Sequence, residues 1–203
     1  MYFKKIVFHD IITNGEFGFM NVIFLDFDGV LNTHFYYSNE LIESKIAILA
    51  DICHEYDCKV VIEASAKNAI DEDTMDVNSS SAWVNFIFDL FKKYNIECIG
   101  RTPNVIKRHN DYSYTSIWKE DEIRLYLFRH PEVEHYCVID DDDLRINNRS
   151  DLDKVREHLV VTEDFLLKNP EEEGLLNSHK ELVKQALEKE NEIKKLALKR
   201  KGM

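Results

Sequence analysis

The chain alternates short apolar runs with amphipathic segments, and this alternation limits the folds open to it more than any other feature. The runs are rich in β-branched side chains, which is typical of strands covered on both faces. Strands that alternate with helices build a parallel sheet with right-handed crossovers. The sequence therefore predicts an α/β fold in three layers, with helices on both faces of the sheet. The predicted strands lie at residues 22–25, 59–62, 96–99, 135–139 and 158–161.

Three segments between these runs carry apolar residues at helical spacing. Ser38 or Asn39 could cap the first helix and Ser81 the second. The third helix covers roughly 119–130 and stops before Pro131, which cannot continue it. The apolar faces are formed by Ile42, Ile46, Leu49, Cys53 and Tyr56 in the first segment and by Trp83, Ile87, Leu90 and Tyr94 in the second.

The main α/β domain is predicted over residues 21–177. Residues 1–20 form an N-terminal extension or a hairpin, because two apolar runs flank an Asn-Gly pair. Residues 178–203 hold eight Lys or Arg against four Glu, and the spacing predicts one basic amphipathic helix. This helix packs on the domain, or it binds a protein partner or nucleic acid. Its apolar positions are Leu182, Ala186, Ile193 and Ala197.

Composition limits the cellular location and the binding partners that we expect for this chain. No apolar run approaches the roughly 18 residues of a membrane span, and residues 1–20 lack the long apolar segment of a signal peptide. We therefore expect a cytoplasmic protein without membrane association. Four cysteines are too few for a disulfide scaffold. The 38 Asp and Glu against 26 Lys and Arg oppose binding of a nucleic-acid backbone over the whole surface.

Aspartates follow two of the predicted strands. Asp26 and Asp28 end the first, and Asp140 and Asp141 end the fourth. If the two strands are neighbours, these carboxylates crowd one edge of the sheet, which is unfavourable unless a cation such as Mg²⁺ neutralises them. A carboxylate there can attack a phosphoryl group, and a second acid two residues on can protonate the leaving oxygen. Gly29 lets the backbone turn closely beneath the phosphate, with amide N–H groups pointing at it.

These stretches resemble a known family. "VIFLDFDGVLN" and "YCVIDDDD" look like the first and fourth motifs of the haloacid dehalogenase (HAD) superfamily of phosphohydrolases. More narrowly, the chain is similar over about 21–180 to the HAD domain of "Swiss Army Knife" RNA repair proteins, with "GRTP", "KEDEI", "HLVVT" and "EGLL" in the same order. The resemblance implies a Rossmann-like, HAD-like sheet with little or no cap.

The resemblance also implies roles for the aspartates. Asp26 would be the nucleophile and a metal ligand. Asp28 would be the general acid and base, and a metal ligand through its carbonyl. Asp140 would bind Mg²⁺, with Asp141 helping directly or through water.

The resemblance further implies a cation that steadies the nucleophile and the phosphate. Lys119 matches the position of the cation in the third motif of the family. Lys107, Arg108 or Arg101 could take this role instead.

The second motif departs from the family. Relatives tend to read "SSSWR" after the second strand, whereas this chain reads "EASAK" at 63–67. Ser65 keeps a hydroxyl for a phosphoryl oxygen, and Lys67 falls where the arginine would bind substrate. A Glu63 carboxylate pointing into the site would oppose phosphate binding and raise the pKa of Asp26, unless it joins the metal ligands or pairs with Lys67 or Lys119.

Two hypotheses of different classes result. The first is a Mg²⁺-dependent phosphatase that forms an aspartyl-phosphate and acts on a phosphorylated small molecule or a nucleic-acid end. The second is a degenerate HAD-like domain that binds a ligand or partner without turnover. A small lid within 68–118 could carry Tyr112, Tyr114 and Trp118, whose rings pack in the protein or stack on bases.

Overall fold

A single five-stranded sheet organises the chain in the computed structural model, which describes residues 19–32, 38–108, 114–116, 119–143, 153–162 and 172–201. The strand order is β3-β2-β1-β6-β7, and each neighbouring pair is parallel. Every predicted run forms one of these strands, so this part of the prediction is confirmed. The strands are β1 (Met20–Leu25), β2 (Cys58–Ile62), β3 (Cys98–Arg101), β6 (Val133–Asp140) and β7 (Leu159–Val161).

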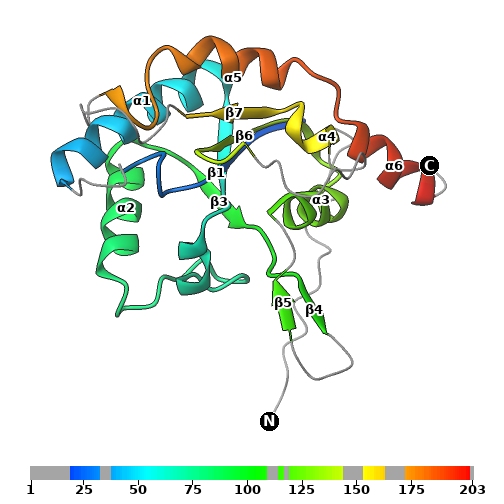
Figure 1. Cartoon of the computed structure of the whole chain (residues 1–203), viewed down its shortest axis with the longest axis horizontal. Coiled ribbons are helices and arrows are strands. Elements are labelled where there is room, and N and C mark those ends of the chain that lie inside the picture. The colour runs from blue at the N-terminus through cyan, green and yellow to red at the C-terminus, as the bar shows by residue number, and fades with distance from the viewer. Residues whose placement is uncertain are drawn as a thin grey trace, which may run out of the picture.

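Helices cover both faces of the sheet, as the α/β prediction requires (Figure 1). One core packs Ile23 and Leu25 of β1 against the helices of one layer, and the other core packs Val22 and Phe24 against the opposite layer. This alternation follows from the two-residue period of a strand. The first layer holds α1 (Asn39–Tyr56), α2 (Ala82–Lys93) and α5 (His179–Leu187), and the second holds α3 (Lys119–Arg129), α4 (Asp153–Arg156) and α6 (Glu192–Lys201).

The helix ends agree in part with the sequence prediction. Ser38 caps α1, because its Oγ accepts a hydrogen bond from the N–H of Leu41 at 3.0 Å. Ser81 stands at the N-cap position of α2, but its side chain makes no capping hydrogen bond, so that part of the prediction is wrong. Helix α3 ends at Arg129, before Pro131, as expected.

The C-terminal segment forms two helices where the spacing predicts one. The break lies at Asn191, which is buried between α5 and α6. Its Oδ1 accepts a hydrogen bond from the N–H of Lys194 at 3.0 Å, and its Nδ2 donates to the carbonyl of Val133 at 3.1 Å. The chain therefore turns at Asn191 and packs α6 on the α3 layer, with Ile193 in the second core.

A small antiparallel pair, β4 (Ile106–Arg108) and β5 (Tyr114–Ser116), projects from the body between β3 and α3 (Figure 1). This is a modest ribbon, in keeping with little or no cap. The aromatic side chains of the expected lid, residues 1–18 of the extension or hairpin predicted over 1–20, and the side chains of 197–201 lie outside the described part. None of the helices in the described ranges combines the length and the apolar character needed to cross a membrane.

Candidate active site

The carboxyl ends of β1 and β6 lie side by side at the centre of the sheet. The two strands pair in parallel with Leu25 opposite Ile139, and the N–H of Asp26 donates to the Ile139 carbonyl at 3.0 Å. The side chains that follow the two strands therefore emerge at one edge, where open α/β sheets bind ligands. Asp26 and Asp140 could meet only if the strands before them were neighbours, and β1 and β6 are neighbours.

Three aspartates converge at this edge. Asp26 and Asp140 are buried, Asp141 is half-buried, and one carboxylate oxygen from each lies within 4.8 Å of the others. Asp26 Oδ1 accepts the N–H of Phe27 at 2.7 Å, and Asp140 Oδ1 accepts the N–H of Asp142 at 2.9 Å. These backbone contacts fix the direction of both carboxylates.

Lys119, the first residue of α3, joins the two buried carboxylates. Its Nζ donates to Asp26 Oδ2 at 2.5 Å and to Asp140 Oδ2 at 2.8 Å. Helix α3 thus delivers the predicted cation from a segment 93 residues from Asp26 in the chain. Arg101, another candidate for this cation, is bound elsewhere in the structure, since its Nε donates to the carbonyl of Ile70 at 2.8 Å. The side chains of Lys107 and Arg108 lie outside the described part.

Burial and charge perturb these groups strongly. Burial raises the pKa of Asp26 to about 6, with Lys119 opposing the shift and Asp140 adding to it. Burial likewise raises the pKa of Asp140. Although burial acts to lower the pKa of Lys119, the two carboxylates outweigh it and raise that pKa above its usual value.

The donor set fits a hard divalent cation. Three carboxylates against one ammonium leave an excess of negative charge in a largely buried place, which an ion such as Mg²⁺ would neutralise. The carboxylates of Asp26 and Asp140 are already fixed in direction by hydrogen bonds. The cluster is therefore suited to hold a metal ion.

Asp28 stands apart from this cluster on an exposed turn. Its Oδ1 accepts a hydrogen bond from Asn32 Nδ2, and Asn32 Oδ1 accepts the N–H of Gly29, both at 2.9 Å. The Gly29 carbonyl accepts the hydroxyl of Thr162 at 2.9 Å. Asn32 and Thr162 thus position Asp28 and its turn, and the sequence reasoning missed both of them. The role of Asn32 could have been predicted from its position four residues after Asp28, at the end of "DGVLN".

The structure requires glycine at position 29 for a reason that differs from the expected one. We expected Gly29 to let the turn point amide N–H groups at a phosphate, whereas the N–H of Gly29 itself donates to Asn32. Its backbone has φ +70°, and a Cβ placed there would collide with the carboxylate of Asp141. Glycine is therefore required for the turn and for the close approach of Asp141.

The unusual second motif forms a buried network behind the site. Lys67 Nζ contacts Glu63 Oε2 at 3.2 Å and Thr102 Oγ1 at 2.9 Å, and it also pairs with Glu122. The Thr102 hydroxyl donates to Glu63. Lys67, which we expected at the substrate, is instead bound on several sides within the protein. The sequence considered a Glu63–Lys67 pair but missed Thr102 and Glu122.

The protonation of this network bears on the site. Burial raises the pKa of Glu63 to about 8, although Lys67 opposes the shift. One ammonium faces two buried carboxyl groups, so burial and the neighbouring Glu122 favour the neutral form of Glu63, whereas Lys67 favours the charged form.

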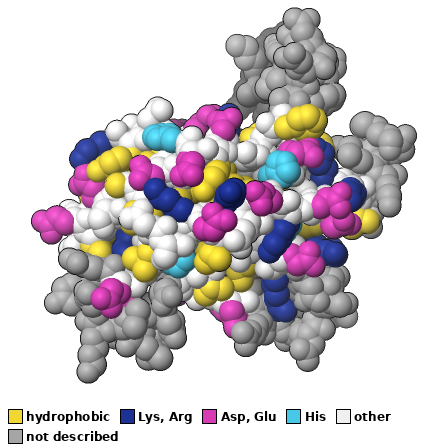
Figure 2. Space-filling view, turned by 90° about the horizontal axis from the view of Figure 1, so that it is seen from above, with side chains coloured by type: hydrophobic (Ala, Val, Ile, Leu, Met, Phe, Trp, Pro, Cys, Tyr) yellow, Lys and Arg dark blue, Asp and Glu magenta, His cyan; other side chains and the backbone are white. Residues whose placement is uncertain are grey.

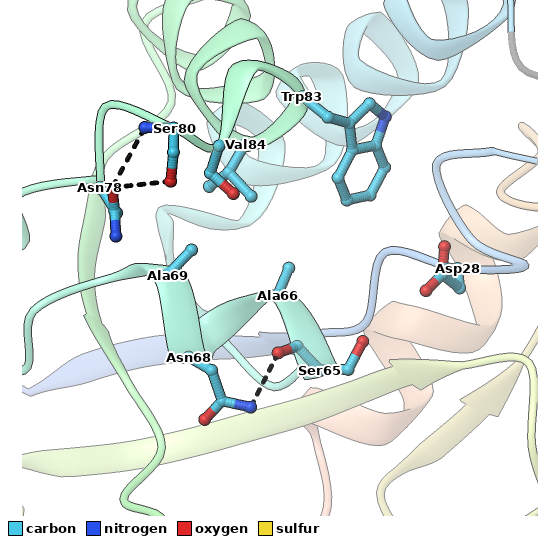
Figure 3. Close-up of a pocket in the computed structure, with 10 residues that line it drawn as sticks. Asp28, Ser65, Ala66, Asn68, Ala69, Asn78, Ser80, Trp83 and Val84 are labelled. Carbon is cyan, nitrogen blue, oxygen red and sulfur yellow. Dashed lines mark hydrogen bonds between the residues drawn. The ribbon is translucent and has the colours of Figure 1, made fainter.

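Ser65 lies at the start of the short 3₁₀ helix η1 (Ser65–Ala69) and is exposed. It lines a cavity of about 560 Å³ together with Asp28. Figure 3 shows the Ser65 hydroxyl directed toward the side of the pocket where Asp28 stands. The structure therefore brings Ser65 and Asp28 to one pocket, and Asp26, Asp140, Asp141 and Lys119 to the adjacent sheet edge.

A comparison with protein families finds one match. The family model described as "HAD domain in Swiss Army Knife RNA repair proteins" matches residues 22–166. The matched segment runs from β1 through β7 and contains the three clustered aspartates as well as Asp28 and Lys119. No curated protein and no solved structure shows a significant match.

Proposed function

Because the chain belongs to the family of HAD domains found in Swiss Army Knife RNA repair proteins, we propose that it is a Mg²⁺-dependent phosphatase that forms an aspartyl-phosphate on Asp26. One observation carries the proposal. Lys119 Nζ bridges Asp26 and Asp140 at 2.5 and 2.8 Å, beside a third carboxylate from Asp141. This arrangement supports a nucleophilic role for Asp26, because the neighbouring carboxylates would attract a divalent cation and Lys119 would attract a phosphate.

Asp26, Asp140 and Asp141 would hold the Mg²⁺ ion, with the backbone carbonyl of Asp28 as a further oxygen. When bound, the ion supplies positive charge that offsets the carboxylates and the phosphoryl oxygens. Lys119 supplies a fixed positive charge at the same edge, because its ammonium is already held by Asp26 and Asp140.

In the first step, a carboxylate oxygen of Asp26 attacks the phosphorus atom and the bond from phosphorus to the leaving oxygen breaks. Asp28 donates a proton to that leaving oxygen, so the product leaves as an alcohol. The Ser65 hydroxyl donates a hydrogen bond to a phosphoryl oxygen. Lys119 balances the negative charge that gathers near Asp26.

In the second step, the Asp28 carboxylate takes a proton from a water molecule, whose oxygen attacks the phosphorus of the aspartyl-phosphate. The bond between phosphorus and the Asp26 oxygen breaks, inorganic phosphate is released, and Asp26 returns as a carboxylate. Asp28 is suited to both steps because Asn32 holds it on an exposed turn, open to the pocket and to water.

The contacts of Glu63 favour this function over a non-catalytic binding domain. The concern raised by "EASAK" was a negative charge that repels phosphate. Lys67 and Thr102 bind the Glu63 carboxyl, and its raised pKa reduces its charge at neutral pH. Ser65 remains exposed to the pocket, so a hydroxyl is available where the family uses one.

The substrate we propose is a phosphorylated nucleic-acid end or another phosphomonoester of an alcohol. Figure 2 shows acidic and basic side chains interspersed over the visible face, without a broad basic area among the described residues that would track a long phosphate backbone. Recognition of a terminal group suits such a surface better. A protein partner at the C-terminal helices stays a prediction, and the exposed side chains of Leu182 and Leu196 are where it would bind.

The test is hydrolysis of p-nitrophenyl phosphate and of a 5′- or 3′-phosphorylated oligonucleotide with and without Mg²⁺. We expect Mg²⁺-dependent release of phosphate that falls by at least about a thousandfold in Asp26→Asn, because the amide is not a nucleophile. Asp89→Asn makes the same chemical change on the exposed face of α2 and should leave the rate unchanged. Equal rates in Asp26→Asn and the wild type would refute the mechanism, and metal binding without hydrolysis of any phosphoester would favour the binding domain.

A further inference from the structure

The pocket beside Asp28 is large enough for more than a phosphate. It measures about 560 Å³ and lies between η1 and the start of α2, with Asp28 at one end (Figure 3). Small-molecule sites commonly measure roughly 300–1,000 Å³. The residues that line it therefore indicate which group attached to the phosphate could bind there.

The position of Asp28 decides which part of the substrate enters this pocket. In the proposed mechanism, on which this inference rests, Asp28 donates its proton to the leaving oxygen. A general acid must lie within hydrogen-bond reach of the atom that it protonates. The group that carries the leaving oxygen therefore lies on the Asp28 side of the phosphorus atom, where the pocket opens.

The walls of the pocket suit a flat ring. Trp83 enters from α2, and Ala66 and Ala69 stand across from it on η1 (Figure 3). Phe27 packs edge-on against the Trp83 ring, with centroids 5.5 Å apart and an interplanar angle of 76°, which restrains the orientation of the indole. The small alanine side chains leave space opposite an aromatic wall.

The polar lining suits an uncharged group that accepts hydrogen bonds. Asn68 and Asn78 line the pocket, and each side-chain amide carries two N–H donors. The amide oxygens are already engaged, because Asn68 Oδ1 accepts from Asn104 Nδ2 at 2.8 Å and Asn78 Oδ1 accepts the N–H and the hydroxyl of Ser80 at 3.1 and 2.9 Å. Asn68 Nδ2 donates to the Ser65 carbonyl at 3.2 Å, which accounts for only one of its two N–H groups. None of the described residues that line the pocket is basic. An anionic leaving group would therefore find no cation there to offset its charge.

We infer that the pocket between Trp83 and the η1 alanines binds the leaving group of the substrate, and that this leaving group is a nucleoside. A nucleoside is uncharged, carries a flat heterocycle that stacks on an aromatic side chain, and presents hydroxyl and ring nitrogen groups that amides recognise. The same unit occurs in a free mononucleotide and at the phosphorylated end of a chain.

The experiment compares three alkyl phosphates with the full-length protein and Mg²⁺. Adenosine 5′-monophosphate has a neutral leaving group with a ring, glycerol 3-phosphate a neutral one without a ring, and 3-phosphoglycerate an anionic one. We expect the KM for the nucleotide to be lower than that for glycerol phosphate by about tenfold or more, as stacking of one base predicts. The KM for 3-phosphoglycerate should be the highest of the three.

Variants separate the pocket from the catalytic groups. Ala69→Leu fills the end of the pocket away from Asp28, and Trp83→Ala removes the stacking wall. Each should raise the KM for the nucleotide about tenfold, and should raise the KM for glycerol phosphate by much less because that substrate has no ring to stack. Trp83→Phe should restore much of the affinity. Lys92→Ala, on the exposed side of α2, should alter neither substrate.

A binding measurement keeps this inference distinct from the proposed function. Saturation-transfer NMR with unphosphorylated adenosine should show contact to the wild type, and the signal should weaken in Ala69→Leu even if no phosphoester is hydrolysed. Turnover of all three esters with equal KM, or no adenosine signal, would overturn the nucleoside pocket. If a 5′-phosphorylated dinucleotide has the same KM as the mononucleotide, the result would support the pocket and identify the phosphorylated end of a chain as the source of the nucleoside.

Discussion

Lys67 Nζ lies 3.2 Å from Glu63 Oε2, within a buried network that includes Thr102 and Glu122. The four side chains come from the end of β2, from η1, from the end of β3 and from α3. Helix α3 also carries Lys119 to the aspartates. The network thus connects the segment that holds Ser65 with the helix that begins at Lys119.

Removing the ammonium of this network should destabilise the fold. Lys67→Met leaves the Glu122 carboxylate buried without its cation, and breaking such a pair costs about 3–5 kcal/mol. We expect the free energy of unfolding to fall by that amount in urea denaturation. Lys92→Met, on a side chain that is 80% exposed, should change it by less than about 0.5 kcal/mol. A Lys67→Met protein as stable as the wild type would show that the network contributes little.

The raised pKa of Glu63 predicts how stability depends on pH. This pKa rises from 4.5 to about 8 on folding, so the folded protein binds more protons between these values and stability falls as pH increases through them. Glu63→Gln removes the titrating group. Between pH 6 and 9, the melting temperature of the wild type should fall by a few degrees more than that of the variant. Parallel curves for the two proteins would contradict the assignment.

Lys119 should control both turnover and the response to metal. Lys119→Met removes the charge that balances Asp26 and Asp140, so we expect phosphatase activity to fall by roughly a hundredfold or more. Because the carboxylates then repel one another more strongly, Mg²⁺ should raise the melting temperature of the variant by more than it raises that of the wild type. Unchanged activity would assign the role to another cation, such as Lys107 or Arg108.

Gly29 should tolerate no side chain. At φ +70°, an alanine is strained, and its Cβ would meet the carboxylate of Asp141. We expect Gly29→Ala to lower the free energy of unfolding by about 1–3 kcal/mol and to weaken Mg²⁺ binding measured by calorimetry. Gly100→Ala is the matched control, because its Cβ would meet Tyr126 Oη at 3.1 Å, away from the aspartates. Equal metal affinity in Gly29→Ala and the wild type would show that Asp141 is not a ligand.

Much of the fold could be predicted because its signals are local. Each strand of the sheet was visible as an apolar run, and Ser38 and Pro131 marked helix ends. The spacing of apolar residues could not predict two separate C-terminal helices, because the break at Asn191 depends on its hydrogen bond to Val133, 58 residues away.

The sequence by itself determined the alternation of strands and helices and the presence of acids after two of the strands, since periodicity and chain order are properties of single segments. Only the tertiary structure decided that Glu63 turns to Lys67, Thr102 and Glu122, and that Ser65 shares a pocket with Asp28. These contacts join residues that are distant in sequence, and burial alters the charges of the groups they bring together. No local pattern encodes either effect.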